Sequence, residues 1–164
     1  MKPITPFLWF DKEAEQAAKF YVSVFKKKSK IINVTRYGST GPGAKGTVMV
    51  VDFEVNGQRF SALNGGPIFK HSPAISFVVH CKTQKEIDTY WKKLLAGGGQ
   101  PSQCGWLTDK FGVSWQIVPD LLLKTLVGKD KAKAERIMAA QMKMVKFDVA
   151  ALEAAAKGPK RKAA

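Results

Sequence analysis

The stretch from Cys104 to Pro119 carries the residues whose types and spacing best fit a ligand-binding site. Its second half alternates, so that Ser114 and Gln116 face one way from a predicted strand while Trp115 faces the other. A hydroxyl and an amide on one face, backed by aromatic packing on the other, can orient a small organic molecule through hydrogen bonds. These residues therefore predict non-covalent recognition, and they identify no catalytic group.

The cysteines and histidines show no metal-binding pattern. Cys81 and Cys104 lie in separate predicted strands without metal-type spacing, so we expect two reduced thiols packed as small hydrophobic groups. A pocket-lining or reactive role stays open for Cys104. His71 precedes a predicted strand and His80 lies near its far end, which separates them by ~30 Å of extended chain. We therefore expect neither histidine to bind a metal ion.

The glycine-rich segment 38–46 superficially suggests a phosphate-binding loop. Ala44 stands where the pattern that begins at Gly38 requires a lysine, and a strand follows where a helix is required. We interpret the segment as a flexible connection between strands.

The chain of 164 residues has a formal charge of +14, which calls for a nucleic-acid hypothesis. From Leu121 onward there are eleven basic and four acidic residues, so half of the excess belongs to the C-terminal quarter. A basic terminal tail is usually solvated, and only four arginines are available for base reading. Nucleic-acid binding is therefore kept only as an alternative, in which a dimer uses its basic helical tail.

The composition is that of a globular protein without a membrane span. Apolar residues make up 45% of the chain, and no apolar run approaches the roughly 18 to 20 residues that a span needs. The start, 1–5, carries one charge and then enters a strand pattern, so no signal peptide is visible. We expect a cytoplasmic protein that makes no membrane contact.

The predicted elements occur twice in the same order. The first half is predicted to form a strand, a helix with Asp11 as its N-cap, and three strands, at 4–10, 11–28, 31–37, 48–55 and 58–64. The second half is predicted to repeat this order, at 74–81, 83–96, 100–103, around Trp106 and at 114–118. Each half has a tight hairpin before its last strand, at Asn56-Gly57 and at 109–112.

This repetition indicates one internally duplicated α+β domain. Its modules are predicted at 3–66 and 72–119, followed by a helical extension at 120–157 and a basic disordered tail at 158–164. Asp148 is expected to cap the last helix of the extension.

With both halves laid out, the chain resembles the vicinal oxygen chelate superfamily of glyoxalase I, extradiol dioxygenases and the fosfomycin and bleomycin resistance proteins. Within that superfamily it is similar to the PhnB-like group, often labelled 3-demethylubiquinone-9 3-methyltransferase, over residues 3–157. The motifs that carry the resemblance are Ile4–Asp11 leading to Ala17–Tyr21, then Gln58–Pro67, Ala74–Phe77 and Cys104–Gln116. The resemblance implies a glyoxalase-like fold, in which two βαβββ modules form a curled mixed sheet around a cup, and a protein that usually forms homodimers.

A small organic ligand is expected in this cup. The residues expected to line it come from the first strand, the fourth strand and the closing strands, and they are Thr5, Phe7, Trp9, Ala62, Asn64, Cys104, Trp106, Ser114 and Gln116. The two tryptophans would stack on an apolar body, while the two amides would supply donors and acceptors.

The resemblance also bears on cofactors. Metal-dependent members hold a divalent ion at positions that fall near Thr5, Ala62 and Ala74 and at Gln116, and only the last resembles a ligand. We therefore expect no cofactor and no metal. The alternative is a metal-dependent lyase, isomerase or dioxygenase in which Gln116 and water or substrate oxygens complete a weak site. Methyl transfer is a further alternative, although the usual glycine-rich strand-to-helix turn for S-adenosylmethionine is missing from the sequence.

Overall fold

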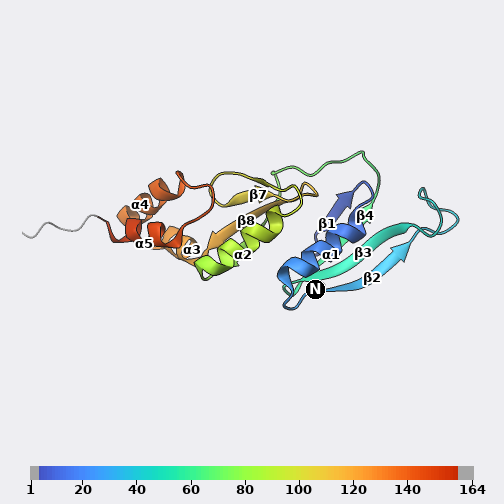
Figure 1. The fold of residues 1–164 in the computed structure, drawn as a ribbon, viewed down its shortest axis with the longest axis horizontal. Helices are drawn as coiled ribbons and strands as arrows, with labels where there is room; N and C mark the ends of the chain where they lie inside the picture. Colours follow the sequence, from blue (N-terminus) through green and yellow to red (C-terminus); the bar gives the residue numbers. More distant parts are fainter. Residues whose placement is uncertain (1–3, 159–164) are drawn as a thin grey trace, which may run out of the picture. The chain divides into compact units, whose positions relative to one another are not determined.

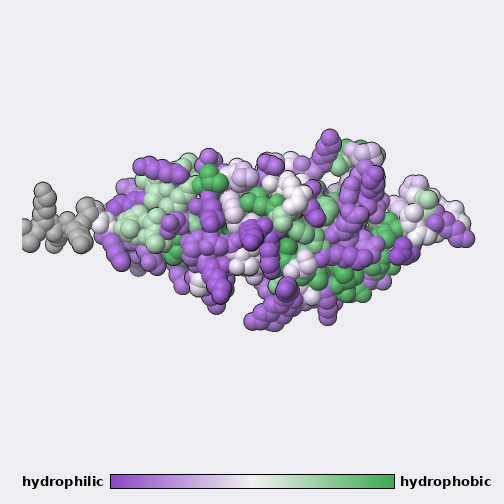
Figure 2. Space-filling view, viewed as in Figure 1, coloured by the Kyte–Doolittle hydropathy of each residue, from purple (hydrophilic) through white to green (hydrophobic). Residues whose placement is uncertain are grey.

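The structure is a computed structural model that describes residues 4–158, apart from the side chain of Leu126. The chain forms two compact units, Met1–His71 and Ser72–Ala164. Each unit holds one four-stranded mixed sheet with a helix packed on it (Figure 1). Hydrophilic residues dominate the surface in view, and hydrophobic residues reach it in scattered places (Figure 2). Within the described range, every helix is too short or too polar to traverse a lipid bilayer.

The first unit has the predicted order of strand, helix and three strands. Its elements are β1 (Phe7–Phe10), α1 (Ala14–Phe25), β2 (Lys30–Arg36), β3 (Val48–Val55) and β4 (Gln58–Asn64). The sheet order is β1-β4-β3-β2, with β1 parallel to β4 and the other pairs antiparallel. Asn56 and Gly57 both have positive φ angles, as the predicted two-residue hairpin turn requires.

Helix α1 covers one face of this sheet. Its buried stripe includes Ala17, Tyr21 and Val24, and the Tyr21 ring stacks on Phe53 of β3 at a centroid distance of 6.1 Å. The prediction that Asp11 caps this helix was wrong, because the helix begins at Ala14 with Glu13 as an N-cap that makes no side-chain bond.

The second unit repeats this topology. Its elements are β5 (Ser76–Cys81), α2 (Gln84–Leu95), β6 (Gln100–Pro101), β7 (Trp106–Thr108) and β8 (Ser114–Pro119). The sheet order is β5-β8-β7-β6, again with the first strand parallel to the last. Thr83 caps α2 as predicted, since its hydroxyl accepts from the Glu86 N–H at 3.2 Å. The predicted α+β fold with two βαβββ modules is therefore confirmed.

The turn before β8 is built around one buried carboxylate, Asp109, which is 3% exposed. Its Oδ1 accepts from the backbone N–H groups of Phe111 and Val113 at 2.8 and 3.1 Å. Its Oδ2 accepts from Trp115 Nε1 at 2.8 Å. Gly112 follows with a φ of 86°, a conformation that favours glycine. One side chain therefore fixes both the turn and the indole ring of the next strand.

The C-terminal extension consists of α3 (Asp120–Leu126), α4 (Lys131–Gln141) and α5 (Val149–Lys157). Asp148 caps α5 as predicted, because its carboxylate accepts from the Ala151 N–H at 3.0 Å. The Arg136 guanidinium joins α4 to the end of α5 by donating to the carbonyls of Ala155 and Ala156, both at 3.0 Å. Of the predicted basic tail, residues 159–164 lie outside the described residues.

Within the second unit, the segment between α4 and α5 packs against the residues that precede β7. The N–H groups of Cys104 and Gly105 donate to the carbonyls of Met144 and Val145, both at 2.8 Å. Phe147 is 2% exposed, and its ring lies against Gly105. The extension therefore completes the core of this unit.

Candidate functional site

Three of the residues predicted to bind a ligand lie together on one face of the second sheet. The strand register pairs Trp106 with Gln116, and Ser114 with both Thr108 and Ser76. Paired residues project from the same side of a sheet. The alternate residues Leu107, Trp115 and Ile117 are buried and apolar, and α2 packs on β7 and β8. Trp106, Ser114 and Gln116 therefore share the face opposite α2, named here the Ser114 face.

The polar atoms of the Ser114 face differ in whether they have a hydrogen-bond partner. Gln116 Nε2 donates to Ser76 Oγ at 2.9 Å. Ser114 is only 3% exposed, yet its Oγ has no hydrogen-bond partner within the described part of the chain. A buried hydroxyl in this condition carries a penalty of about 1 to 3 kcal/mol. A ligand that offers a hydrogen bond to this oxygen removes that penalty.

Cys104 belongs to a different environment. Its backbone has a φ of 55°, and its thiol lies 3.5 Å from the Gln141 carbonyl and 3.8 Å from the Met142 sulfur. It contacts the C-terminal extension and is not brought together with Ser114 and Gln116. The other cysteine, Cys81, is fully buried, and burial raises the pKa of its thiol to about 12. Cys81 is therefore an uncharged core residue.

The candidates from the first unit divide between two faces of its sheet. Phe7 pairs with Ser61 and Trp9 with Leu63, whereas Ala62 and Asn64 pair with Leu8 and Phe10 on the face covered by α1. Phe7 is 59% exposed, and Thr5 is an exposed residue before β1. The structure therefore does not bring Ala62 and Asn64 together with Phe7 and Trp9.

Trp9 is held by its own unit. Its Nε1 donates to the Gly66 carbonyl at 2.8 Å, and its ring meets Phe69 edge-on at 5.1 Å between centroids. A side chain at Gly65 would collide with the indole, because an added Cβ would lie 2.3 Å from it. Trp9 therefore has local partners that orient it without a ligand.

Asn64 connects three segments of the first unit. Its Oδ1 accepts from the Ala14 N–H at 2.8 Å, and its Nδ2 donates to the Val48 carbonyl at 3.0 Å. Its own carbonyl accepts from the Tyr37 hydroxyl at 2.7 Å. The side chain thus supplies the N-terminal bond of α1 that Asp11 was predicted to make.

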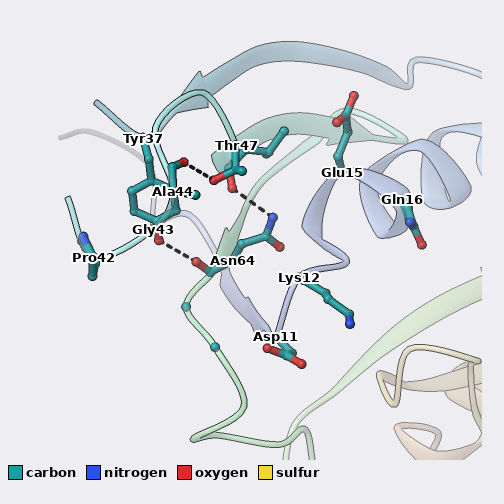
Figure 3. Close-up of a pocket in the computed structure, with 13 residues that line it drawn as sticks. Asp11, Lys12, Glu15, Gln16, Tyr37, Pro42, Gly43, Ala44, Thr47 and Asn64 are labelled. Carbon is teal, nitrogen blue, oxygen red and sulfur yellow. Dashed lines mark hydrogen bonds between the residues drawn. The ribbon is translucent and has the colours of Figure 1, made fainter. Parts of the chain in front are cut away.

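Asn64 also lines a pocket that the sequence interpretation missed, named here the Tyr37 pocket (Figure 3). The pocket has a volume of about 650 Å³ and is bounded by the start of α1, the loop after Tyr37 and the end of β4. Gly41 and Gly43 lie so close to the Tyr37 ring that an added Cβ would be 2.7 and 2.4 Å from it. The predicted flexible connection therefore wraps an aromatic ring. A tyrosine followed by a glycine-rich loop is the signal that could have indicated this.

The residues present fit neither a divalent metal ion nor S-adenosylmethionine. Within residues 4–158, no group of three or more His, Cys, Asp or Glu side chains could hold a metal ion. Two of the positions that the resemblance assigns to metal ligands are alanines, and Gln116 offers only a neutral amide oxygen. For S-adenosylmethionine, the connection from β1 to α1 at 11–13 contains no glycine, and the glycines at 97–99 follow a helix.

Comparison with solved structures identifies the fold of this chain. The glyoxalase fold is shared with the fosfomycin resistance protein FosX from Listeria monocytogenes, at 12% identity and a TM-score of 0.52, over 70% of this chain and 87% of that one. Protein PA1353 from Pseudomonas aeruginosa is similar at 19% identity and a TM-score of 0.59, over 73% and 98%. A comparison with curated proteins gave no match.

A family model and a more similar solved structure identify the family. The family model described as 3-demethylubiquinone-9 3-methyltransferase matches residues 2–118. The PhnB protein from Bacillus cereus, described as a candidate 3-demethylubiquinone-9 3-methyltransferase, is 39% identical, over 72% of this chain and 99% of that one, with a TM-score of 0.65. The chain belongs to this PhnB-like family. The family match ends at Val118, so the C-terminal extension lies beyond it.

Proposed function

We propose that this PhnB-like protein binds a small organic molecule on the Ser114 face of its second sheet. The observation that carries the proposal is the buried Ser114 hydroxyl, which has no hydrogen-bond partner among the described residues. Gln116 and Ser76 lie beside it and offer further donors and acceptors, while Trp106 offers a flat apolar surface. The ligand would be partly aromatic or apolar and would carry a polar group that bonds to the serine.

The same observation favours binding over covalent catalysis. A serine nucleophile needs a base within hydrogen-bonding distance of its hydroxyl. Ser114 Oγ has no such neighbour within residues 4–158, and its partners in the strand register are Ser76 and Thr108, which are not bases at neutral pH. No cofactor is part of the proposal. The two free cysteines suit a reducing compartment, so the cytoplasm is the proposed location.

A Ser114→Ala variant tests the role of the hydroxyl. We expect the ligand-free variant to be more stable than the parent, with a free energy of unfolding about 1 kcal/mol higher, because the hydroxyl without a partner is removed. A compound found by thermal-shift screening, present at a hundred times its Kd, should raise the free energy of unfolding of the parent protein by about 2.7 kcal/mol. We expect the variant to lose most of that gain at the same concentration.

Ser102→Ala is the matched control, because Ser102 is exposed in the same unit. It should leave both stability and the ligand-induced shift unchanged. The proposal is wrong if Ser114→Ala destabilises the ligand-free protein while the ligand-induced shift stays the same. That result would give the hydroxyl a purely structural role.

We also propose that two copies of the chain form a homodimer, as the PhnB-like resemblance implies. Phe7 and Val78 lie on the faces opposite α1 and α2 and are 59% and 42% exposed, so they offer apolar surface to a partner. Light scattering on the full chain should give twice the monomer mass of 18.0 kDa. The Phe7→Glu variant should shift towards the monomer mass, because a charge would be placed in the apolar contact. Val127→Glu, at an 86% exposed position of the extension, should leave the dimer intact. A parent protein that stays monomeric at high concentration would contradict this.

A further inference from the structure

Three sulfur-containing residues that the proposed function does not use lie where the turn before β7 meets the end of α4. The Cys104 thiol is 3.8 Å from the Met142 sulfur. Met138 precedes Met142 by four residues and lies on the same side of α4, because residues four apart in a helix are neighbours. Cys104, Met138 and Met142 are named here the sulfur cluster.

Gln141 lies between the members of the sulfur cluster. Its backbone carbonyl is 3.5 Å from the Cys104 thiol, and its Nε2 donates to the Met138 sulfur at 3.0 Å. Its Oε1 is buried and has no hydrogen-bond partner among residues 4–158. A buried amide oxygen without a partner carries an energetic penalty, which a bound cation removes. This oxygen is an observation independent of the sulfur atoms, and it points to a ligand at the same place.

Backbone hydrogen bonds hold the two parts of the sulfur cluster together without a ligand. The N–H groups of Cys104 and Gly105 donate to the carbonyls of Met144 and Val145, which anchors the turn to the segment after Met142. In tetrahedral metal sites the sulfur ligands lie about 2.3 Å from the ion, which places two of them about 3.8 Å apart. The sulfur atoms of Cys104 and Met142 therefore already have the separation of two ligands of one ion.

The donor atoms of the sulfur cluster favour a soft monovalent ion. Thiolate and thioether sulfur atoms select Cu(I), whereas Zn²⁺ is usually held by thiolate, imidazole and carboxylate groups. The described residues offer no group of three or more His, Cys, Asp or Glu side chains for the second kind of site. Met138 and Met142 are 41% and 62% exposed, so an ion can reach them from solvent.

We propose that the sulfur cluster binds one Cu(I) ion. The Cys104 thiol releases its proton to water and binds as the thiolate, so the thiolate and the ion together are uncharged. The thioethers of Met138 and Met142 each donate a lone pair, and Gln141 Oε1 serves as a weak further ligand, a role that amide oxygens have in copper sites. No electron is transferred in this step. The site joins the family-matched part of the chain to the C-terminal extension and is independent of the Ser114 face.

Anaerobic titration of the full chain with Cu(I), in competition with the chromophoric chelator bathocuproine disulfonate, tests this site. We expect one tightly bound ion per chain. Cu(I) is diamagnetic, so nuclear magnetic resonance can follow the methionine methyl groups during the titration. The methyl signals of Met138 and Met142 should shift on binding, whereas that of Met49 in the first unit should not. Zn²⁺ at the same concentration should leave all three signals unmoved, because thioethers are poor ligands for it.

Met142→Leu removes one sulfur atom at an exposed position and keeps a side chain of similar size. It should weaken Cu(I) binding by at least about tenfold, because even groups that only orient a metal ligand contribute about 10- to 100-fold in affinity. Cys104→Ser should abolish the binding of one ion per chain. The matched control is Met49→Leu, which also removes one thioether but from β3, and it should bind Cu(I) like the parent.

Three results would overturn the proposal. The first is a Met142→Leu variant that binds Cu(I) as tightly as the parent, because the thiol would then act alone. The second is a titration in which the methyl signals of Met138 and Met142 stay in place. The third is a Zn²⁺ titration that shifts these signals as strongly as Cu(I) does.

Discussion

Asp109→Ala is expected to lower the free energy of unfolding by about 4 kcal/mol, measured by urea denaturation with tryptophan fluorescence. The buried carboxylate accepts three hydrogen bonds, from the N–H groups of Phe111 and Val113 and from Trp115 Nε1. Each hydrogen bond to a charged group contributes about 1.5 to 3 kcal/mol, and the contributions within one network are not additive. Alanine would leave a buried indole N–H and two turn amides without this acceptor.

The control for this prediction is Asp130→Ala. Asp130 also accepts a backbone bond, from Lys133 at 2.9 Å, but it is an exposed helix cap, whose loss typically costs about 1 kcal/mol. Asp109→Asn should fall between the two alanine variants, because the amide keeps one acceptor oxygen. Equal losses in the two alanine variants would show that the carboxylate does not organise the hairpin.

Gly105→Ala is expected to cost about 3 to 4 kcal/mol and to loosen the C-terminal extension. The added Cβ would lie 2.4 Å from the Phe147 ring and 2.9 Å from the Ile117 carbonyl, at a backbone φ of 79°. The ring cannot move without exposing apolar surface, and the carbonyl belongs to β8. We expect faster tryptic cleavage after Lys143 and Lys146, which lie in the segment between α4 and α5 that carries Phe147.

Two further variants separate the causes of this loss. Gly46→Ala has a similar φ of 85° with nothing within 4 Å of the added Cβ, so it should cost only the backbone term of about 1 to 2 kcal/mol. Adding Gly105→Ala to a Phe147→Ala protein should cost less than adding it to the parent, because the two positions are coupled. Fully additive losses would contradict the assigned contact.

The duplicated fold could be predicted because its signals are local. The Asn56-Gly57 turn and the cap at Thr83 are each specified within a few residues, and each forms as predicted. The α1 cap could not be predicted in the same way, because the partner of Ala14 is Asn64, fifty residues away in sequence. Local patterns identify the elements and the caps at Thr83 and Asp148, whereas the start of α1 depends on a bond between residues far apart in sequence.

The faces on which the candidate residues lie could be predicted for β8 but not for β4. Alternation along β4 separates Phe60 and Ala62 from Ser61 and Leu63, but both sets contain small or apolar residues. The sequence therefore does not reveal which set α1 covers, and the expected placement of Ala62 and Asn64 beside Phe7 and Trp9 differs from their observed placement on the α1 face. Along β8 the two sets differ in polarity, so Ser114 and Gln116 could be placed on one face.

The position of Phe147 has a consequence for how the protein is made. The family match ends at Val118, yet the second unit buries a ring that is synthesised 29 residues later. The first unit can fold while the ribosome is still translating, because domains generally fold as units from the N-terminus. The second unit cannot bury Gly105 under the Phe147 ring until the segment between α4 and α5 has been synthesised, so this part of its core is completed last.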